Sequence, residues 1–296
     1  MEIVNLAFYK FVELDGLAEL RADYKEFCLA QQLKGTILFA REGINTIIAG
    51  TRGAIDALRA KLDADPRFAD LPYKESLSDH QPFTRMLVKI KKEIVAFGIE
   101  VNPAAHRAPS LTPRQLKQWL DEGRDIVLLD TRNDYECLTG KFRGAHELDI
   151  RTFRTFPEKV KELLPRWKDK TIVSYCTGGI RCEKAAPYMR QVGFEDVYQL
   201  DGGILKYFEE VGGAHYDGEC FVFDYRIGVN PGLAETATAH CQGCQFPVTA
   251  EMQQDPRYLP PKQCPNCADR PRGLAASSSP ERPDAKDAAT SDRSAS

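Results

Sequence analysis

The 296-residue chain contains no run of about 18 consecutive apolar residues, the length that a helix needs to cross a bilayer. Its first five residues, Met1–Asn5, carry an acid where a secretory signal has lysine or arginine. We therefore expect a cytoplasmic protein without membrane association. The net charge of only −3 excludes a protein that is basic over its whole surface, although a local basic face remains compatible with it.

The sequence also lacks a flavin motif, a haem-ligand pattern and an obvious set of two histidines and one carboxylate. What it does contain is enough apolar surface for real cores, since 43% of the residues are hydrophobic and 9% are aromatic. The length allows two domains, or two domains and a small appendage. In a reducing compartment, its nine cysteines are not expected to form a disulfide framework, and some of them should be metal ligands or reactive thiols.

Residues 1–101 predict a ferredoxin-like α+β domain. Apolar and aromatic enrichment predicts strands at residues 4–12, 36–40, 46–49, 86–90 and 94–97. Helical spacing predicts helices at residues 17–33 and 51–62, with Gly35 as a C-cap of the first and Thr51 as the N-cap of the second. The order β-α-β-β-α-β is the split βαβ arrangement.

A linker is expected at 102–109, and residues 111–218 then follow a different pattern. Thr112 and Pro113 resemble the start of a helix. Short apolar runs at residues 126–129, 172–175 and 197–200 are separated by helical segments at 157–164 and 183–191. This alternation predicts a parallel sheet with helices on its faces, whose ligands bind beyond the carboxyl ends of the strands. Residues 219–272 contain short strands and cysteine pairs, and 273–296 are expected to be a disordered tail.

The most informative stretch follows the strand at 172–175 and starts with Cys176. A six-residue loop is predicted there, with the residues Cys176, Thr177, Gly178, Gly179, Ile180 and Arg181. The two glycines allow backbone N–H groups to point inward, and a helix begins directly afterwards. A thiolate in such a nest has a lowered pKa and is nucleophilic, although the cradle equally suits a persulfide, an oxidised sulfur or a bound oxyanion. The alternative is a small apolar residue at a strand end.

The loop spacing separates two chemistries. Cysteine phosphatases place five residues between the cysteine and the arginine, whereas four lie between Cys176 and Arg181. The segment 111–218 therefore resembles the rhodanese family, whose six-residue loop is sized for sulfur. Asp130, Arg132 and Glu136 are expected to tie the loop and its neighbours in place, and Cys182 is either a resolving thiol for an oxidised Cys176 or a buried thiol at a helix start.

Two CxxC pairs, separated by nineteen residues, lie near the C-terminus. They are formed by Cys241, Cys244, Cys264 and Cys267. Four thiolates with this spacing are typical of a structural Zn²⁺ site, and redox disulfides are the main alternative. A closed site of four cysteines stabilises the fold and leaves no open position for catalysis.

Basic residues gather in two segments of an otherwise near-neutral chain. The candidates for RNA contacts are Arg85, Lys89, Lys91, Lys92, Arg151 and Arg154. The last two alternate with Phe153 and Phe156, so that a positive and partly aromatic face for RNA is one interpretation. The other is an ordinary solvated surface.

The order of these parts, from Asn5 to Cys267, resembles the bacterial rhodanese-domain tRNA uridine hydroxylases. The stretches that carry the resemblance are Lys34–Leu38, Glu42–Asn45, Arg85–Ile94, Leu129–Glu136, Cys176–Ala185 and Gly218–Asp224. The resemblance implies oxygen-dependent hydroxylation of C5 of the wobble uridine in tRNA, with Cys176 as the essential residue and molecular oxygen as co-substrate. Attack of the thiol on C6 of uracil and delivery of oxygen by an oxidised sulfur are both hypotheses for its role.

Two alternatives come from other classes of protein. The first is a sulfurtransferase that carries sulfane sulfur as a persulfide on Cys176. The second is a non-catalytic RNA-binding or scaffold module, against which the retention of Cys176, both glycines and Arg181 argues.

Overall fold

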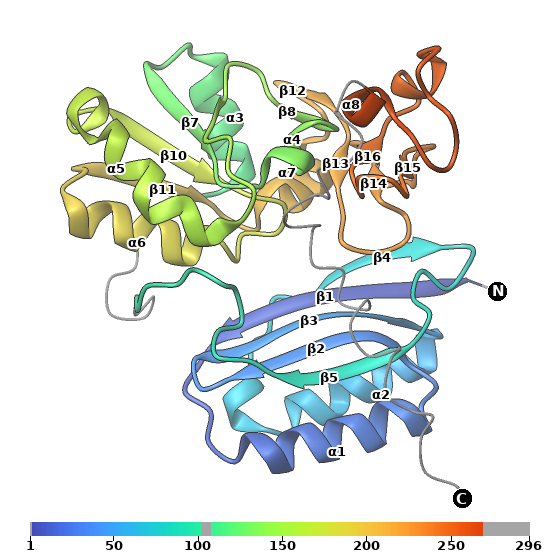
Figure 1. Ribbon diagram of the computed structural model, residues 1–296. Helices are drawn as coiled ribbons and strands as arrows, with labels where there is room; N and C mark the ends of the chain where they lie inside the picture. The colour runs from blue at the N-terminus through green and yellow to red at the C-terminus, as the bar shows by residue number, and fades with distance from the viewer. Residues whose placement is uncertain (1, 102–107, 269–296) are drawn as a thin grey trace, which may run out of the picture. The chain divides into compact units, whose positions relative to one another are not determined.

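The computed structural model describes residues 2–101 and 108–268 of the chain (Figure 1). The chain divides into two compact units, Met1–Ala237 and Thr238–Ser296. The larger unit contains two five-stranded sheets. Most of the predicted linker and nearly all of the predicted tail, at 102–107 and 269–296, lie outside the described residues.

The first sheet has helices on one face (Figure 1). Its elements are β1 (Ile3–Phe11), α1 (Leu17–Ala30), β2 (Lys34–Ala40), β3 (Gly43–Gly50), α2 (Arg52–Asp63), β4 (Lys74–Ser78) and β5 (Met86–Ile90). The strand order is β4-β1-β3-β2-β5. Each helix therefore connects two strands that have a third strand between them, which is the split βαβ arrangement. The prediction of a ferredoxin-like domain is confirmed, with β5 added parallel to β2 at one edge.

Two strand predictions in this domain are wrong. The strand β4 was missed because its sequence, Lys-Glu-Ser-Leu-Ser, is polar, as is common in an edge strand. Residues 94–97 form no strand, although Ile94 and Phe97 are almost fully buried. Their backbone N–H groups donate to the carboxylates of Glu42 and Glu93, at 2.7 and 2.9 Å, instead of to a neighbouring strand. The apolar run therefore fills a core without joining a sheet.

The predicted glycine cap of α1 is also wrong. The helix ends at Ala30, and Gln32, with φ of 55°, takes the left-handed conformation after it. Gly35 lies inside β2, where a side chain would collide with the backbone of Ile47 on β3. The N-cap prediction for α2 is confirmed, because the Thr51 side chain accepts a hydrogen bond from the N–H of Ala54.

Successive side chains of a strand alternate between the two faces of a sheet, and this places two sets of residues on β1. Leu6 and Phe8 belong to the core under the helices, whereas Tyr9 points to the opposite side. On β4, Glu75 pairs with Arg52 of α2. Lys74 and the other residues on its side of the strand therefore face away from the helices. We call this second side, which carries Tyr9 and Lys74, the helix-free face.

The second sheet has the order β6-β11-β10-β7-β9, and all of its strand pairs are parallel. Its strands are β6 (Ser110–Leu111), β7 (Ile126–Asp130), β9 (His146–Glu147), β10 (Thr171–Tyr175) and β11 (Asp196–Leu200). The helices of this part are α3 (Pro113–Asp121), α4 (Asp134–Cys137), α5 (Phe156–Trp167), α6 (Cys182–Val192) and α7 (Gly203–Val211). Thr112 caps α3 with a capping box, as the sequence predicts.

Both faces of this sheet are buried, as expected for a parallel sheet. Ile172 packs in one core with residues of α5 and α6. Val173, the next residue of the same strand, packs in a second core with residues of α3 and α7. The prediction of helices on both faces is therefore confirmed.

Short antiparallel pairs follow. The larger unit has β8 (Gly140–Phe142) with β12 (Tyr216–Gly218), and β13 (Cys220–Phe221) with β14 (Gly228–Val229). The smaller unit has β15 (Ala239–His240) with β16 (Pro247–Val248), followed by α8 (Pro265–Ala268). Within the described ranges, no helix combines the length and the apolar character that a membrane span requires.

Candidate active site

Cys176 directly follows β10, at the carboxyl end of the parallel sheet, and only 1% of its surface is exposed. The backbone N–H of Gly179 donates a hydrogen bond to its Sγ atom at 3.1 Å. Gly179 has a φ of 98°, which a residue with a side chain rarely adopts. The loop therefore curls around the sulfur in the way that the two glycines predict.

The surroundings of Cys176 favour its thiolate. Burial by itself raises the pKa of this thiol, because the charged form is poorly solvated. The Cys182 thiol, the charge of Arg181 and the N–H groups of Arg181 and Gly179 outweigh that effect and lower the pKa to about 5. The sulfur is therefore an anion at neutral pH, which is the nucleophilic form.

Helix α7 holds the thiol loop through two backbone hydrogen bonds. The N–H groups of Ile204 and Leu205 donate to the carbonyl groups of Cys176 and Thr177, at 3.0 and 3.1 Å. Gly203 has a φ of 66°, and a side chain there would meet the backbone of the thiol loop. The double glycine before α7 therefore permits the close approach that fixes the loop.

Arg181 is buried and forms a two-pronged ion pair with Glu136 of α4, with both N···O distances at 2.6 Å. The Oε1 atom of Glu136 also accepts a hydrogen bond from the Thr177 hydroxyl at 3.3 Å. Arg181 thus adds positive charge near the sulfur while its guanidinium is held by Glu136.

Asp130 and Arg132, at the end of β7, form a second two-pronged ion pair, and neither side chain is exposed. Arg132 also donates to the carbonyl group of Gly140 at 2.7 Å. These two residues hold the backbone beside the thiol loop and do not reach into it.

Cys182 lies at the first position of α6 and is fully buried. Burial and the neighbouring Cys176 sulfur raise the pKa of its thiol well above the ordinary value. The thiol therefore stays protonated and can donate to the Cys176 thiolate. Both cysteines are free, so this arrangement is the reduced one.

Two residues of the first domain reach the loop, and sequence reasoning missed both. Lys74 of β4 donates from Nζ to the carbonyl oxygen of Gly178 at 2.5 Å. The hydroxyl group of Tyr9 on β1 lies 2.8 Å from the point where a Cβ atom on Gly179 would be. Because β4 was not recognised as a strand, the alternation that turns Lys74 toward the helix-free face was not visible in the sequence.

A buried lysine joins the same two domains beside the loop. Lys184 of α6 has only 1% of its side chain exposed and pairs with Glu42 and Glu93, each at 2.8 Å. It also donates to the carbonyl group of Val95 at 3.2 Å. These ion pairs give Glu42 and Glu93 a structural role, and both residues lie in stretches that carry the sequence resemblance.

The segment after β13 carries an exposed aromatic ring beside the loop. Phe223 is 46% exposed and lies against the guanidinium of Arg181, with 5.8 Å between the Arg181 Cζ atom and the ring centroid. Arg226, a few residues further on, pairs with Asp224 and donates to Ser76 of β4 at 2.7 Å. Phe223 was a further residue that sequence reasoning missed, although it lies in a stretch that carries the resemblance.

The six basic candidates fall into two segments. Lys91 and Lys92 follow the edge strand β5, on which Lys89 lies, and Arg85 precedes it. Phe97, a little further along, packs against Phe153 and Phe156, near Arg151 and Arg154. The interpretation of an aromatic RNA-binding face was wrong in one respect, because Phe153 and Phe156 are 5% and 0% exposed and form part of the core.

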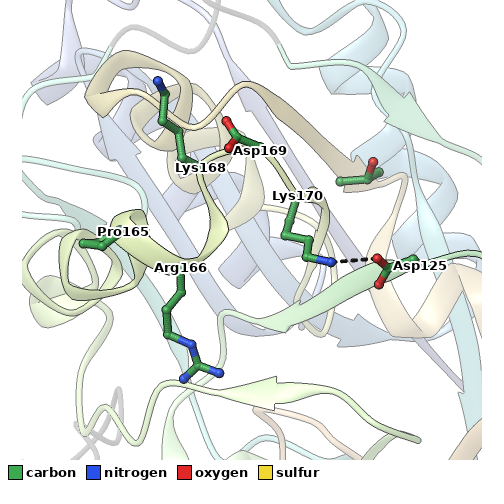
Figure 2. A pocket seen from close by; sticks show the side chains of 7 residues that line it. Asp125, Pro165, Arg166, Lys168, Asp169 and Lys170 are labelled. Carbon is green, nitrogen blue, oxygen red and sulfur yellow. Dashed lines mark hydrogen bonds and ion pairs between the residues drawn. The ribbon is translucent and has the colours of Figure 1, made fainter.

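A shallow hollow lies at the opposite end of the sheet, where β10 begins, and measures about 390 Å³ (Figure 2). Its rim carries Arg166, Lys168 and Lys170, and Lys170 pairs with Asp125 at 2.6 Å. Thr171 lines it, whereas Cys176 follows the other end of the same strand. At roughly 3.3 Å per residue, the two lie about 16 Å apart, so this hollow is not part of the thiol site.

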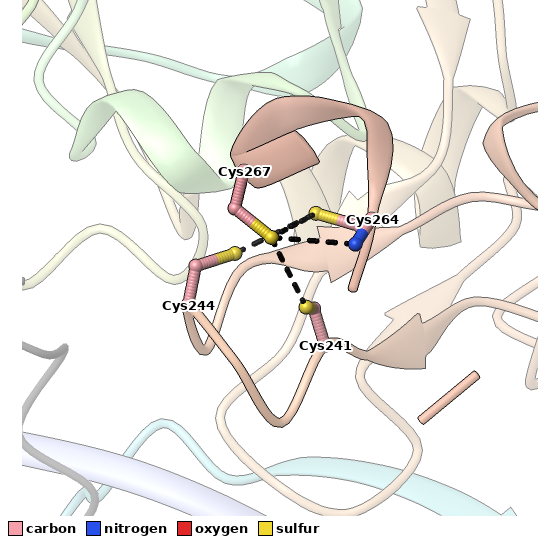
Figure 3. A group of neighbouring side chains, drawn as sticks. All are labelled: Cys241, Cys244, Cys264 and Cys267. Carbon is pink, nitrogen blue, oxygen red and sulfur yellow. Dashed lines mark hydrogen bonds between the residues drawn. The ribbon is translucent and has the colours of Figure 1, made fainter. Parts of the chain in front are cut away.

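The smaller unit holds the four predicted cysteines around one point (Figure 3). The sulfur atoms lie within 4.8 Å of one another, and the Cys241–Cys267, Cys244–Cys264 and Cys264–Cys267 pairs are 3.7, 3.5 and 3.8 Å apart. A tetrahedral ion with bonds of about 2.3 Å needs sulfur atoms about 3.8 Å apart. The cluster therefore fits a metal ion bound by four thiolates.

A six-residue thiolate loop at the carboxyl end of a parallel sheet, with helices on both faces, is typical of a rhodanese-type protein. Family models agree, since residues 112–210 match the rhodanese-like domain and residues 3–94 match the UPF0176 acylphosphatase-like domain. In sequence, the chain is 55% identical to the tRNA uridine(34) hydroxylase of Cupriavidus taiwanensis, over 90% of this chain and 97% of that one.

The enzyme of the same name from Cupriavidus metallidurans is 53% identical, over 93% of this chain and 100% of that one. Among solved structures, the rhodanese-like domain of an Anabaena protein matches with 24% identity and a TM-score of 0.32, over 37% of this chain and 79% of that one. The protein belongs to the tRNA uridine(34) hydroxylase family.

Proposed function

We propose that this protein hydroxylates C5 of uridine 34 in tRNA, with molecular oxygen as co-substrate and Cys176 as the catalytic residue. Full-length similarity to enzymes of that name supports the substrate. The observation that carries the role of Cys176 is its sulfur, held as an anion by the N–H of Gly179 and the charge of Arg181. The relatives' names favour hydroxylation over the sulfurtransferase alternative.

The thiolate is suited to addition at C6 of the uracil ring. In that step a bond forms between sulfur and C6, and the electron pair of the C5–C6 double bond moves onto the O4 carbonyl. C5 becomes the electron-rich carbon of an enolate, and no oxidant or reductant is consumed. The addition makes C5 reactive toward an oxygen donor. Burial of Cys176 keeps bulk water away from the sulfur.

The deciding experiment analyses tRNA nucleosides from a deletion strain that carries the wild-type gene, the Cys176→Ser variant or no insert. We expect 5-hydroxyuridine-derived nucleosides only with the wild type, and ¹⁸O₂ should label them. Persistence of these nucleosides in the deletion strain, with no second pathway, would contradict the proposal. Rapid transfer of sulfur from thiosulfate to cyanide would favour the sulfurtransferase instead.

We further propose that Phe223 stacks on the target base. Aromatic rings bind unpaired bases by stacking, with about 1–3 kcal/mol for each base. Phe223→Ala should therefore raise KM for tRNA by about tenfold, since 1.4 kcal/mol corresponds to a factor of ten. The matched control is Leu77→Ala, which removes a similarly exposed apolar side chain from β4. Equal KM values in steady-state assays of Phe223→Ala and wild type would exclude this role.

The four-cysteine cluster is proposed to hold one structural Zn²⁺. The ion stabilises the fold of the smaller unit, because four thiolates leave it no open position. We expect about one zinc per chain by elemental analysis, and a loss of that zinc in Cys241→Ser. The control is Cys28→Ser, at a buried cysteine of the first domain, which should keep its zinc. Folded wild-type protein without metal would contradict this assignment.

We propose that six basic residues contact the tRNA backbone, namely Arg85, Lys89, Lys91, Lys92, Arg151 and Arg154. We propose that the chain consists of two domains, at 1–101 and 111–218, followed by a C-terminal region at 219–272 and a tail at 273–296. A tRNA substrate also supports a cytoplasmic protein.

A further inference from the structure

A single peptide group of the thiol loop connects Lys74 to Cys176. The carbonyl oxygen of Gly178 and the N–H of Gly179 belong to the same peptide unit. That carbonyl oxygen accepts a hydrogen bond from Lys74 Nζ at 2.5 Å, and that N–H donates to Cys176 Sγ at 3.1 Å. Hydrogen bonds in such a chain polarise one another, most strongly where water is excluded.

We propose that Lys74 is a positioning residue of the active site, which acts through the Gly178–Gly179 peptide to hold the Cys176 sulfur as an anion. A positive charge on the carbonyl oxygen draws electrons away from the N–H of Gly179 and makes it a stronger donor to sulfur. The hydrogen bond from Lys74 also fixes the orientation of the Gly178–Gly179 peptide. That orientation requires the φ of 98° at Gly179, which glycine adopts readily. The acylphosphatase-like domain therefore completes the site of the rhodanese-like domain.

The charged groups around this series of hydrogen bonds are consistent with the proposed role of Lys74. Arg181 and Cys182 face the sulfur from the loop and α6, with Glu136 behind Arg181. On the other side, burial lowers the pKa of Lys74 below its ordinary value. The charges of Cys176, Asp201 and Glu183 oppose this effect without cancelling it, and the charge of Lys206 adds to it. Tyr9 packs under Lys74, with 5.4 Å between Nζ and its ring centroid. Lys74 is partly buried, and the Cys176 thiolate is one of the anions that favour its charged form.

The test measures the pH dependence of alkylation of Cys176 by iodoacetamide in the folded protein. Trypsin releases the peptide 171–181, in which Cys176 is the only cysteine, so mass spectrometry follows this thiol alone. The midpoint of the rate profile reports the pKa of the thiol, and the plateau at high pH reports its accessibility. The assay needs neither tRNA nor oxygen, so its result stands apart from the proposed hydroxylation on which the catalytic meaning of Lys74 rests.

Lys74→Met should raise the midpoint by about one pH unit, in the range that a nearby opposite charge produces. Lys74→Arg, which keeps the charge, should recover most of the shift. The matched control is Lys10→Met, since Lys10 also donates to a backbone carbonyl, that of Ala69, in the same domain. Its midpoint should equal that of the wild type.

An unchanged midpoint in Lys74→Met would overturn the proposal. A changed plateau with an unchanged midpoint would do the same, because it would show a tie that is merely structural. Thermal unfolding shows whether each variant folds. If Lys74→Met does not fold, Lys74→Gln, which also removes the positive charge, replaces it in the comparison with Lys74→Arg. In the hydroxylation assay, the acidic limb of kcat/KM should move with the alkylation midpoint.

Discussion

Replacing Cys176 with serine should lower the rate of uridine hydroxylation by about 10³-fold or more, the scale of loss when a catalytic nucleophile is removed. A serine hydroxyl in the same position stays protonated, because its ordinary pKa is far above that of a thiol. The surroundings that lower the pKa of Cys176 to about 5 cannot bring a hydroxyl into the neutral range. The measurement is single-turnover formation of 5-hydroxyuridine in purified tRNA.

Cys182→Ser is the matched control for this experiment. It also exchanges sulfur for oxygen beside the loop, and its hydroxyl group still donates to the Cys176 thiolate. We expect its rate to remain within about tenfold of the wild type, on the scale of one neutral hydrogen bond. A Cys182→Ser variant as inactive as Cys176→Ser would instead indicate that both thiols take part, as the resolving-thiol interpretation requires.

The pH profile gives an independent check on the same residue. The thiolate is the reactive form, so activity should be lost as the pH falls through the lowered pKa of Cys176 near 5. Between pH 6 and 7 the rate should change little on account of this group. An acidic limb centred at the ordinary thiol value, near pH 8.5, would contradict the anionic state of the sulfur.

The largest loss of stability is expected from Arg132→Met, which leaves the buried Asp130 carboxylate without its partner. Removing one member of a fully buried pair costs about 3–5 kcal/mol, since the remaining charge is neither solvated nor paired. At about 2–4 °C for each kcal/mol in a protein of this size, the unfolding midpoint should fall by roughly 10 °C. Calorimetry at pH 7 measures it.

A double variant separates the lost pair from the lost packing. Adding Asp130→Asn to Arg132→Met removes the uncompensated charge, so the double variant should be more stable than Arg132→Met alone. A double variant that is less stable would show that packing, not charge, dominates at this position. Calorimetric scans of the single and the double variant at pH 7 distinguish the two outcomes.

The sign of the pH effect follows from the same pair. Burial would raise the pKa of Asp130, but Arg132 outweighs it and lowers the pKa below the ordinary value. In the wild type, the stability that this carboxylate contributes is present above about pH 3.9 and is lost as the pH falls through the lowered value. In Arg132→Met the lone carboxylate is destabilising at pH 7, and protonation relieves it. The difference in free energy of unfolding between the wild type and Arg132→Met should therefore become smaller as the pH falls from 7 toward 4.

Local sequence rules were sufficient for much of this protein. Short apolar runs located β7, β10 and β11, because a strand buried on both faces is apolar throughout. Gly178 and Gly179 indicated a curled loop after Cys176, and the two CxxC pairs indicated a cluster of four thiols, which the smaller unit contains. Each of these signals is contained within a few neighbouring residues or a repeated spacing.

The same rules failed where a residue's role depends on a distant partner. The edge strand β4 is polar and carries no strand pattern, and only its packing against another domain reveals Lys74 as a neighbour of Gly178. Lys184 shows an ordinary helical context in the sequence, yet its partners Glu42 and Glu93 lie more than 90 residues away in the chain.

The sequence by itself determined that a nucleophilic thiol stands at the carboxyl end of a parallel sheet, with a separate four-thiol cluster after it. Nine cysteines, glycine spacing and apolar periodicity are local properties, and they need no knowledge of the packing. Only the tertiary structure decided which charges surround that thiol, because electrostatic effects depend on distance and burial rather than on position in the chain. The helix-free face of the first domain supplies part of that environment, and it does so through side chains about 100 residues or more from the loop.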